Sequence, residues 1–239
     1  MATPADPAEA TPAERETRQS PRSAETNGPA RRQYRSRVAD GSRSVPTEED
    51  RKAAFGEPWR DQSFVEDNPI GLSDETVEKL IPELDELQAT MWTMYHQYHK
   101  HHWLVEGPQF QDLHLFLEEH YTEVHDDIDT LAERMTALGG IPTSDPVNQA
   151  TLSHVPHEPE GTFRICQMLR HDREAETQLS VELRRDIEKA LRLDDHGTKR
   201  LLERVLTRAE ERAHHLDHFL GEDTLEIGLT ASESAVDGS

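Results

Sequence analysis

The feature that most constrains the fold of this chain is a helical repeat of apolar residues. Large apolar side chains recur every three or four positions in four long segments, and no segment alternates apolar and polar residues as a strand would. This spacing places the apolar side chains on one face of an α-helix. We therefore predict an all-α chain, with helices over about 73–106, 109–138, 162–193 and 198–220.

Local signals mark the ends of these predicted helices. Ser73 is a typical N-cap, and it is followed by acidic residues that favour the first turn of a helix. Gly107-Pro108 indicates a loop after the first helix, Gly139-Gly140 a stop after the second, and His196-Gly197 a break after the third.

The lengths of the connections indicate how the helices are arranged. Two connections are short, whereas residues 141–161 form a long one that contains four prolines, with Asp145-Pro146 as the start of a short helix. A ferritin-like four-helix bundle has a long crossover of this kind between its second and third helices. A generic helical bundle is the alternative that the pattern leaves open.

Composition divides the chain into three parts. Residues 1–64 are rich in Pro, Ala and Arg and poor in large aliphatic residues, so we predict a disordered tail. Residues 65–222 hold the helical pattern, and residues 223–239 form an acidic tail predicted to be flexible.

The charge of the chain is concentrated in its helical part. Residues 1–62 contain equal numbers of acidic and basic residues, so the net charge of −22 belongs to the remainder. Many acidic residues and few lysines are typical of a halophile protein, although an ordinary acidic protein is the alternative. The single cysteine excludes an intrachain disulfide, and the absence of a long apolar run favours a cytoplasmic location.

Carboxylates and histidines at helical spacing suggest a metal site. Asp129 and Glu133 lie four residues apart, on one face of the second long helix, while His114 lies fifteen residues earlier. Fifteen residues correspond to roughly 22 Å along a helix, which is too far for one metal ion. If two copies of this helix pack antiparallel across a two-fold axis, His114 of one subunit faces Asp129 and Glu133 of the other, and His102 lies on the same side. Two imidazoles and two carboxylates with open positions suit Fe(II) or Zn.

For the other histidines, a solvated surface position is the ordinary expectation. This interpretation applies to His96, His99, His101, His120, His125 and His154. The cluster of His214, His215 and His218 has spacing that suits a metal ion, but a polar helix face is the preferred explanation. Similarly, Trp103, Phe110 and Phe116 are explained equally well as core residues.

Two stretches carry a resemblance to a known family. "HHWLVEGPQFQDLH" and "DDIDTLAERMTALGGIP" resemble the signature of the Dps proteins, which are miniature ferritins, with spacings of 12, 15 and 4 between His102, His114, Asp129 and Glu133. The resemblance covers about residues 70–222, and the long first stretch together with "AHHLDHFL" is most similar to the haloarchaeal members.

The resemblance implies a function and a site. It implies a di-iron ferroxidase centre shared between subunits, with His102 and His114 from one subunit, Asp129 and Glu133 from its partner, and Trp103 beside them. It also implies that Fe(II) is oxidised by hydrogen peroxide and stored as Fe(III) mineral in a homo-dodecamer. Glu118 and Glu119 match iron-nucleating positions, although Leu115 departs from a third such position.

The resemblance also raises the question of DNA binding, which many family members achieve through Lys-rich tails. Here residues 15–43 hold eight Arg and three acidic residues, whereas the rest of the chain is acidic. We expect tight DNA binding to be disfavoured, so that a location at the nucleoid is the less favoured alternative. A nucleoid-associated shell with a secondary metal role, and storage of another metal such as zinc or copper, are the alternative functions.

Overall fold

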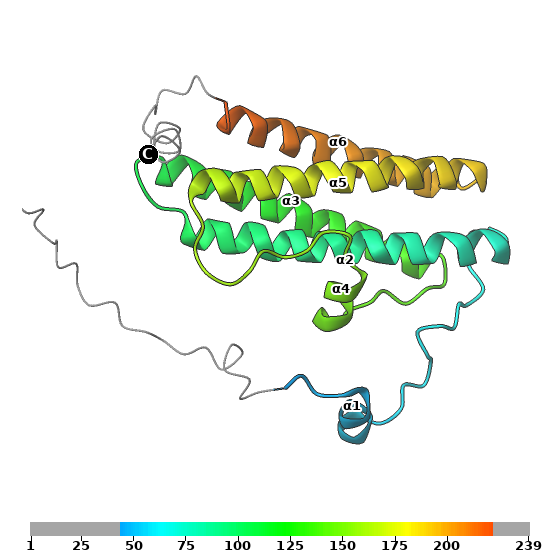
Figure 1. The fold of residues 1–239 in the computed structure, drawn as a ribbon. Coiled ribbons are helices and arrows are strands. Elements are labelled where there is room, and N and C mark those ends of the chain that lie inside the picture. The colour runs from blue at the N-terminus through cyan, green and yellow to red at the C-terminus, as the bar shows by residue number, and fades with distance from the viewer. Residues whose placement is uncertain (1–43, 222–239) are drawn as a thin grey trace, which may run out of the picture. The chain divides into compact units, whose positions relative to one another are not determined.

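A computed structural model describes residues 44–221 of the chain, and all regular structure within them is helical (Figure 1). None of the helices in this range is long and apolar enough to cross a membrane. The chain divides into two compact units after Glu57. The helices are α1 Glu48–Phe55, α2 Asp74–Leu104, α3 Phe110–Ala137, α4 Pro146–Leu152, α5 Ile165–Arg192 and α6 His196–Phe219.

The helix α1 lies inside the segment for which composition predicts disorder. A capping box holds its first turn: the Asp50 amide donates to the Thr47 hydroxyl at 3.2 Å, and the Thr47 amide donates to the Asp50 carboxylate at 2.9 Å. None of its residues is buried. This helix is therefore defined by local polar contacts, which an argument from missing aliphatic residues does not detect. The remainder of the predicted tail, residues 1–43, lies outside the described residues, as does the acidic tail after residue 221.

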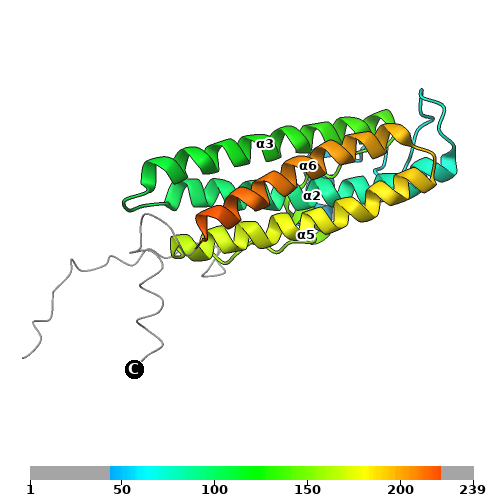
Figure 2. The same cartoon turned by 90° about the horizontal axis from the view of Figure 1, so that it is seen from above.

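In the second unit, α2, α3, α5 and α6 lie side by side as a four-helix bundle (Figures 1 and 2). The helix α2 packs along α3, and α5 packs along α6. The long connection between α3 and α5 carries α4, which packs against α2. Asp145 caps α4 by accepting from the amides of Val147 and Asn148. The predicted fold, a ferritin-like bundle with a short helix in its long crossover, is confirmed.

The apolar stripes predicted from sequence form the core of this bundle. Most residues of these stripes are buried, but Leu191, whose spacing predicts an inward position, is 48% exposed. The adjacent Ala190 is fully buried, so Leu191 lies at the edge of the buried face of α5. Fully buried side chains from the four helices include Leu84, Leu87, Met91, Leu117, Leu131, Met135, Leu179, Leu183, Val205 and Leu216.

The segment before α2 is attached to the end of α3 by hydrogen bonds. The Gln62 side chain donates to the Thr143 hydroxyl at 2.6 Å, and the Glu66 amide donates to the Gly139 carbonyl at 3.0 Å. The compact unit accordingly begins at Pro58, ahead of the boundary proposed from composition. These contacts are made by polar side chains and backbone groups, so a search for periodic apolar residues does not detect them.

Gly139 ends α3 and also receives this segment. Its φ of +90° lies in the left-handed region that favours glycine, and a Cβ there would overlap the carbonyl of Glu66. The Gly140 amide meanwhile donates to the Met135 carbonyl at 2.9 Å, which completes the helix end. The stop predicted at Gly139-Gly140 is thus confirmed, with a second role in close packing.

We predict that Gly139→Ala lowers the free energy of unfolding by about 3 kcal/mol, since it combines left-handed strain with a clash against Glu66. Gly161→Ala is the matched control, because Gly161 also has a positive φ but a Cβ there meets nothing within 4 Å. Denaturant unfolding followed by circular dichroism measures both. Equal losses for the two variants would show that the contact with Glu66 contributes nothing.

Candidate metal site

The α2–α3 hairpin brings His102 and His114 together. His102 lies in the last turn of α2 and His114 near the start of α3, and their rings stack with centroids 3.7 Å apart. The Nδ1 of His102 lies 2.9 Å from the His114 carbonyl oxygen, and the Nδ1 of His114 lies 3.0 Å from the His102 carbonyl oxygen. The two residues therefore hold each other through a reciprocal pair of hydrogen bonds.

This reciprocal pair determines which ring nitrogens are available to a metal ion. A carbonyl oxygen only accepts, so each Nδ1 carries the proton and each neutral ring has its lone pair on Nε2. A backbone carbonyl that orients a histidine through its other nitrogen is a common arrangement around metal sites. The sequence predicted that the two histidines lie on the same side, and the structure adds that their Nε2 atoms make no hydrogen bond within the described residues.

Aromatic side chains surround the pair. Phe110 stacks on His114 at a centroid distance of 4.9 Å, and Tyr121 meets the edge of His102 at 5.3 Å. Trp103 packs on His99 at 4.4 Å but is 66% exposed, as is expected of a side chain on an uncovered face rather than in a core. The hairpin thus presents two imidazoles within an aromatic surface.

The predicted carboxylate ligands lie far along the same helix. Asp129 and Glu133 are exposed on α3, and no hydrogen bond or ion pair reaches their carboxylates from the part of the chain described here. Along the helix axis, Asp129 is roughly 22 Å from His114 and Glu133 is roughly 28 Å from it. Within a single chain the four predicted ligands therefore do not meet, and no group of three or more metal-binding side chains forms among residues 44–221.

Glu118 and Glu119 are also exposed on α3, next to the 53% exposed Leu115. The structure does not bring them to the histidine pair or to Asp129. Their assignment as nucleation residues stays a prediction.

The interior of the bundle is closed to a metal ion by an arginine. Arg212 and Glu176, both essentially inaccessible to solvent, are joined by hydrogen bonds of 2.6 and 3.2 Å, and the Tyr98 hydroxyl donates to the same carboxylate at 2.9 Å. Arg212 also lies 3.5 Å from Asp127. Burial raises the pKa of Glu176, and the neighbouring guanidinium opposes that rise. The partner of the inward carboxylate of Glu176 is thus a guanidinium.

A second polar cluster anchors the crossover to the bundle. Glu158, which lies in the long connection and is 8% exposed, accepts from Lys100 at 2.6 Å and lies 3.0 Å from His101 and 2.8 Å from His171. His101 also bonds Asp172 at 2.7 Å. Burial opposes the charged form of His101, but the two carboxylates raise its pKa above the ordinary value. His101 therefore links Glu158 of the crossover to Asp172 of α5.

Two histidines predicted to be solvated are therefore buried. His101 is completely inaccessible, and His120 is 3% exposed with neither ring nitrogen hydrogen-bonded within the described chain. Burial lowers the pKa of His120 to about 3, so the ring is neutral at physiological pH. The signal was present in the sequence: each continues an inward stripe, His101 after Tyr98 and His120 after Leu117.

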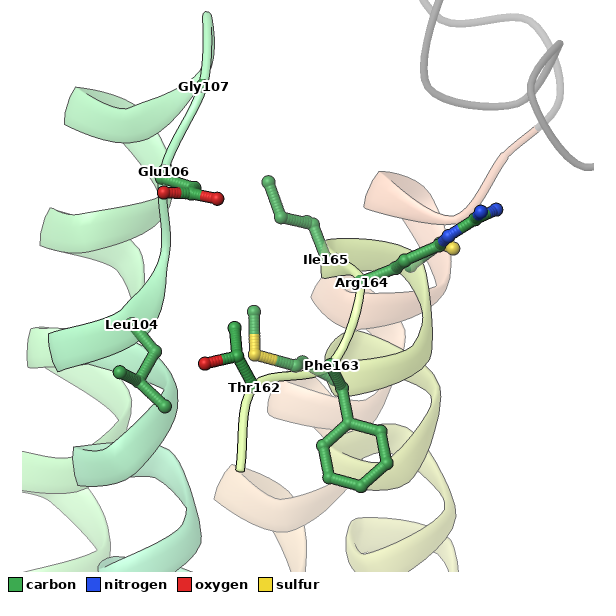
Figure 3. Close-up of a pocket in the computed structure, with 9 residues that line it drawn as sticks. Leu104, Glu106, Gly107, Thr162, Phe163, Arg164 and Ile165 are labelled. Atoms are coloured by element: carbon green, nitrogen blue, oxygen red, sulfur yellow. The ribbon is translucent and has the colours of Figure 1, made fainter. Parts of the chain in front are cut away.

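A surface pocket of about 440 Å³ lies between the C-terminal end of α2 and the segment that precedes α5 (Figure 3). Leu104 and Glu106 form one side, and residues 162–165 form the other. None of the predicted metal ligands lines this pocket, so the pocket is not part of the candidate metal site.

Comparisons with known proteins agree with this fold. Residues 81–225 match the ferritin family, described as a ferritin-like domain. A nutrient stress-induced DNA-binding protein of Synechococcus is 38% identical over 168 residues, covering 70% of this chain and 96% of the relative. A DNA protection during starvation protein of Halobacterium salinarum is 34% identical over 148 residues, covering 62% and 81% respectively.

Solved structures give the same result. An archaeal Dps homologue from Halobacterium salinarum superposes with a TM-score of 0.69 at 34% identity, covering 72% of this chain and 96% of that one. DpsC from Streptomyces coelicolor superposes with a TM-score of 0.69 at 30% identity, covering 71% of this chain and 99% of DpsC. The fold and these matches define a ferritin-like protein. The chain belongs to the Dps family, as its histidine and carboxylate motifs predict.

We predict that Arg212→Met lowers the free energy of unfolding by about 3–5 kcal/mol, because it leaves the Glu176 carboxylate buried without its partner. Arg184→Met is the matched control. Arg184 pairs with Glu210 at the surface, where the two side chains are 54% and 48% exposed, so its loss is expected to cost less than about 1 kcal/mol. Denaturant unfolding at one protein concentration compares them, and similar values would contradict the central role of Arg212.

Proposed function

We propose that this protein is a ferroxidase that oxidises Fe(II) with hydrogen peroxide and stores the Fe(III) product in a hollow shell of twelve subunits. The observation that supports this most directly is the reciprocal His102–His114 pair, which leaves two Nε2 lone pairs on the outer face of a bundle whose interior is filled by Arg212. A metal site of this chain then has to be completed from outside it.

The missing ligands are supplied by a two-fold partner. In an antiparallel pair of α3 helices, Asp129 and Glu133 of one subunit face His102 and His114 of the other, and the symmetry creates two such sites per dimer. The absence of intrachain partners for both carboxylates within the described residues is consistent with this role. Two imidazoles with two carboxylates form a ligand set that suits Fe(II) and leaves positions open for the oxidant.

In the proposed reaction, two Fe(II) ions are the substrate. Each gives one electron to hydrogen peroxide, the O–O bond breaks, and with two protons two water molecules form. Because both electrons are delivered together, no hydroxyl radical is released. Phe110 covers one face of the His114 ring, and the resemblance implies that Trp103 lies beside the site.

The product is a harder ion than the substrate, and it prefers oxygen ligands to imidazole. It is therefore expected to move from the histidines to carboxylates such as Glu118 and Glu119, where mineral grows. The net charge of −22 on each chain raises the local concentration of cations around the assembled protein.

A mixing experiment tests the shared site. His102→Gln/His114→Gln and Asp129→Asn/Glu133→Gln are each expected to slow peroxide-driven Fe(II) oxidation more than about tenfold, since even groups that only orient metal ligands are worth roughly 10–100-fold. After dissociation and 1:1 reassembly, half of the dimers are mixed, and each has one intact site and one doubly defective site. The mixture should therefore recover about a quarter of the wild-type activity.

Stopped-flow absorbance of Fe(III) measures the rate, and mass spectrometry of an isotope-labelled variant verifies that mixed dimers formed. Asp126→Asn, an exposed carboxylate on the same helix, should leave the rate unchanged. No recovery in verified mixed dimers would place the ligands within one chain and overturn the shared site. A normal rate in both double variants would overturn the ferroxidase assignment.

Contact with DNA is a second candidate function, since relatives are named for DNA binding and DNA protection. The acidic bundle repels phosphate, so the Arg-bearing residues 15–43, which lie outside the described residues, are the proposed contact. Deletion of residues 1–43 should abolish binding in a gel-shift series, and the full chain should lose affinity steeply with salt, by roughly 0.9 log units per phosphate contact and decade of salt. Equal binding by the truncated protein would show that the tail is not the contact.

A further inference from the structure

The last turns of α6 present two histidines that face each other. His214 and His218 are four residues apart on an exposed face, their Nε2 atoms lie 3.1 Å apart, and their rings meet edge to face with centroids 4.3 Å apart. Neither belongs to the proposed iron site, which is formed by α2 and α3.

The separation of the two nitrogens fits a common metal ion. With metal–nitrogen bonds of about 2.1 Å, two ligand nitrogens lie about 3.0 Å apart at a right angle and about 3.4 Å apart at the tetrahedral angle. Two Nε2 lone pairs at 3.1 Å repel each other unless a proton or a cation lies between them. A divalent ion satisfies both at once.

The backbone that carries His214 and His218 is fixed by packing and an ion pair, so metal binding does not need to order it. Arg212 and Leu216, on the opposite face of the same turns, are fully buried. Asp217 pairs with Arg173 of α5 at 2.6 Å, and Phe219 packs on Phe116 of α3 with centroids 4.7 Å apart. Only side-chain rotation of the two histidines remains to be lost on binding.

His215 does not share this geometry, although it lies between the two. Its ring centroid is 6.1 Å from that of His214 and 6.2 Å from that of the buried His120, so it turns toward α3. It therefore offers a control that differs by one position along the helix.

We propose that His214 and His218 form a separate, exchangeable binding site for a divalent first-row transition metal ion on the surface of α6. Two protein ligands leave the remaining positions to water, since no third metal-binding side chain joins them within residues 44–221. Open sites of this kind bind and release ions readily, in contrast to closed four-ligand structural sites. Among divalent ions, imidazole ligands favour copper, nickel and zinc over iron and manganese.

The experiment uses the full-length, assembled protein with His102→Gln/His114→Gln as background, so that the proposed iron site does not contribute. Zn²⁺, which has no redox chemistry, is titrated in competition with a chromophoric chelator. We expect about one site per chain, and either His214→Gln or His218→Gln should weaken it about tenfold or more, which corresponds to about 1.4 kcal/mol or more. Circular dichroism and particle size verify that each variant is folded and assembled.

Two controls separate this site from general binding by exposed histidines. His215→Gln and His196→Gln, the latter at the start of α6 with its side chain 70% exposed, should leave zinc affinity unchanged. If zinc binds as tightly without His214 and His218, the proposal is wrong. If His215→Gln weakens binding as much as the other two, the two-ligand assignment is overturned.

Discussion

The buried ion pair of Arg212 and Glu176 is the interaction on which the interior of this bundle depends. Removing two charges from water is costly, and the cost is offset only when every remaining hydrogen-bonding group finds a partner. Here the guanidinium and the carboxylate form two hydrogen bonds, Tyr98 donates a third, and Asp127 lies close to the guanidinium. This set lies in the interior of the bundle, whereas the proposed metal ligands lie on the outer face of α2 and α3, where a single chain offers only half of the proposed ligand set.

A similar principle holds the long crossover in place. Glu158 enters the bundle at the level of Lys100, His101 and His171, and its three contacts fix a connection that carries few apolar residues. The position of α5 relative to α2 therefore depends on charge as well as on the apolar core. Both polar clusters join α2 to α5, whereas the α2–α3 and α5–α6 pairs have continuous apolar seams.

Much of this fold could be predicted from the sequence. The helices and the short helix after Asp145 followed from apolar spacing and cap residues, because those depend on local physics. The burial of His101, His120 and Glu176 was missed, because counting apolar residues ignores a polar side chain at an inward position, even where it continues an apolar stripe. Leu191 shows the opposite error, since an apolar residue at helical spacing is exposed beside the fully buried Ala190.

For the candidate site, the sequence suggested residues but not their geometry. The spacing of His102, His114, Asp129 and Glu133 led to the prediction of a ligand set shared with a partner subunit, and of these four residues the structure brings together His102 and His114. It did not indicate the reciprocal bonds between the histidines and the two backbone carbonyls, which depend on the path of the loop through Gly107. On the proposed assignment, the histidines and carboxylates meet only between two chains, so the sequence of one chain could not give their geometry.

On the proposed assignment, the length of α3 sets the distance between the two halves of the ligand set. This helix bears His114 at one end and Asp129 and Glu133 at the other, so the number of residues between them sets both the separation of the two iron sites in a dimer and the angle at which each ligand emerges. Adding or removing one residue between them would rotate the far end by about 100° and shift it by about 1.5 Å. The same change would turn Val124, Ile128 and Leu131 away from the core. Two constraints therefore act on the length of α3: the packing of its apolar face within one chain, and the register of the two α3 helices in the proposed dimer.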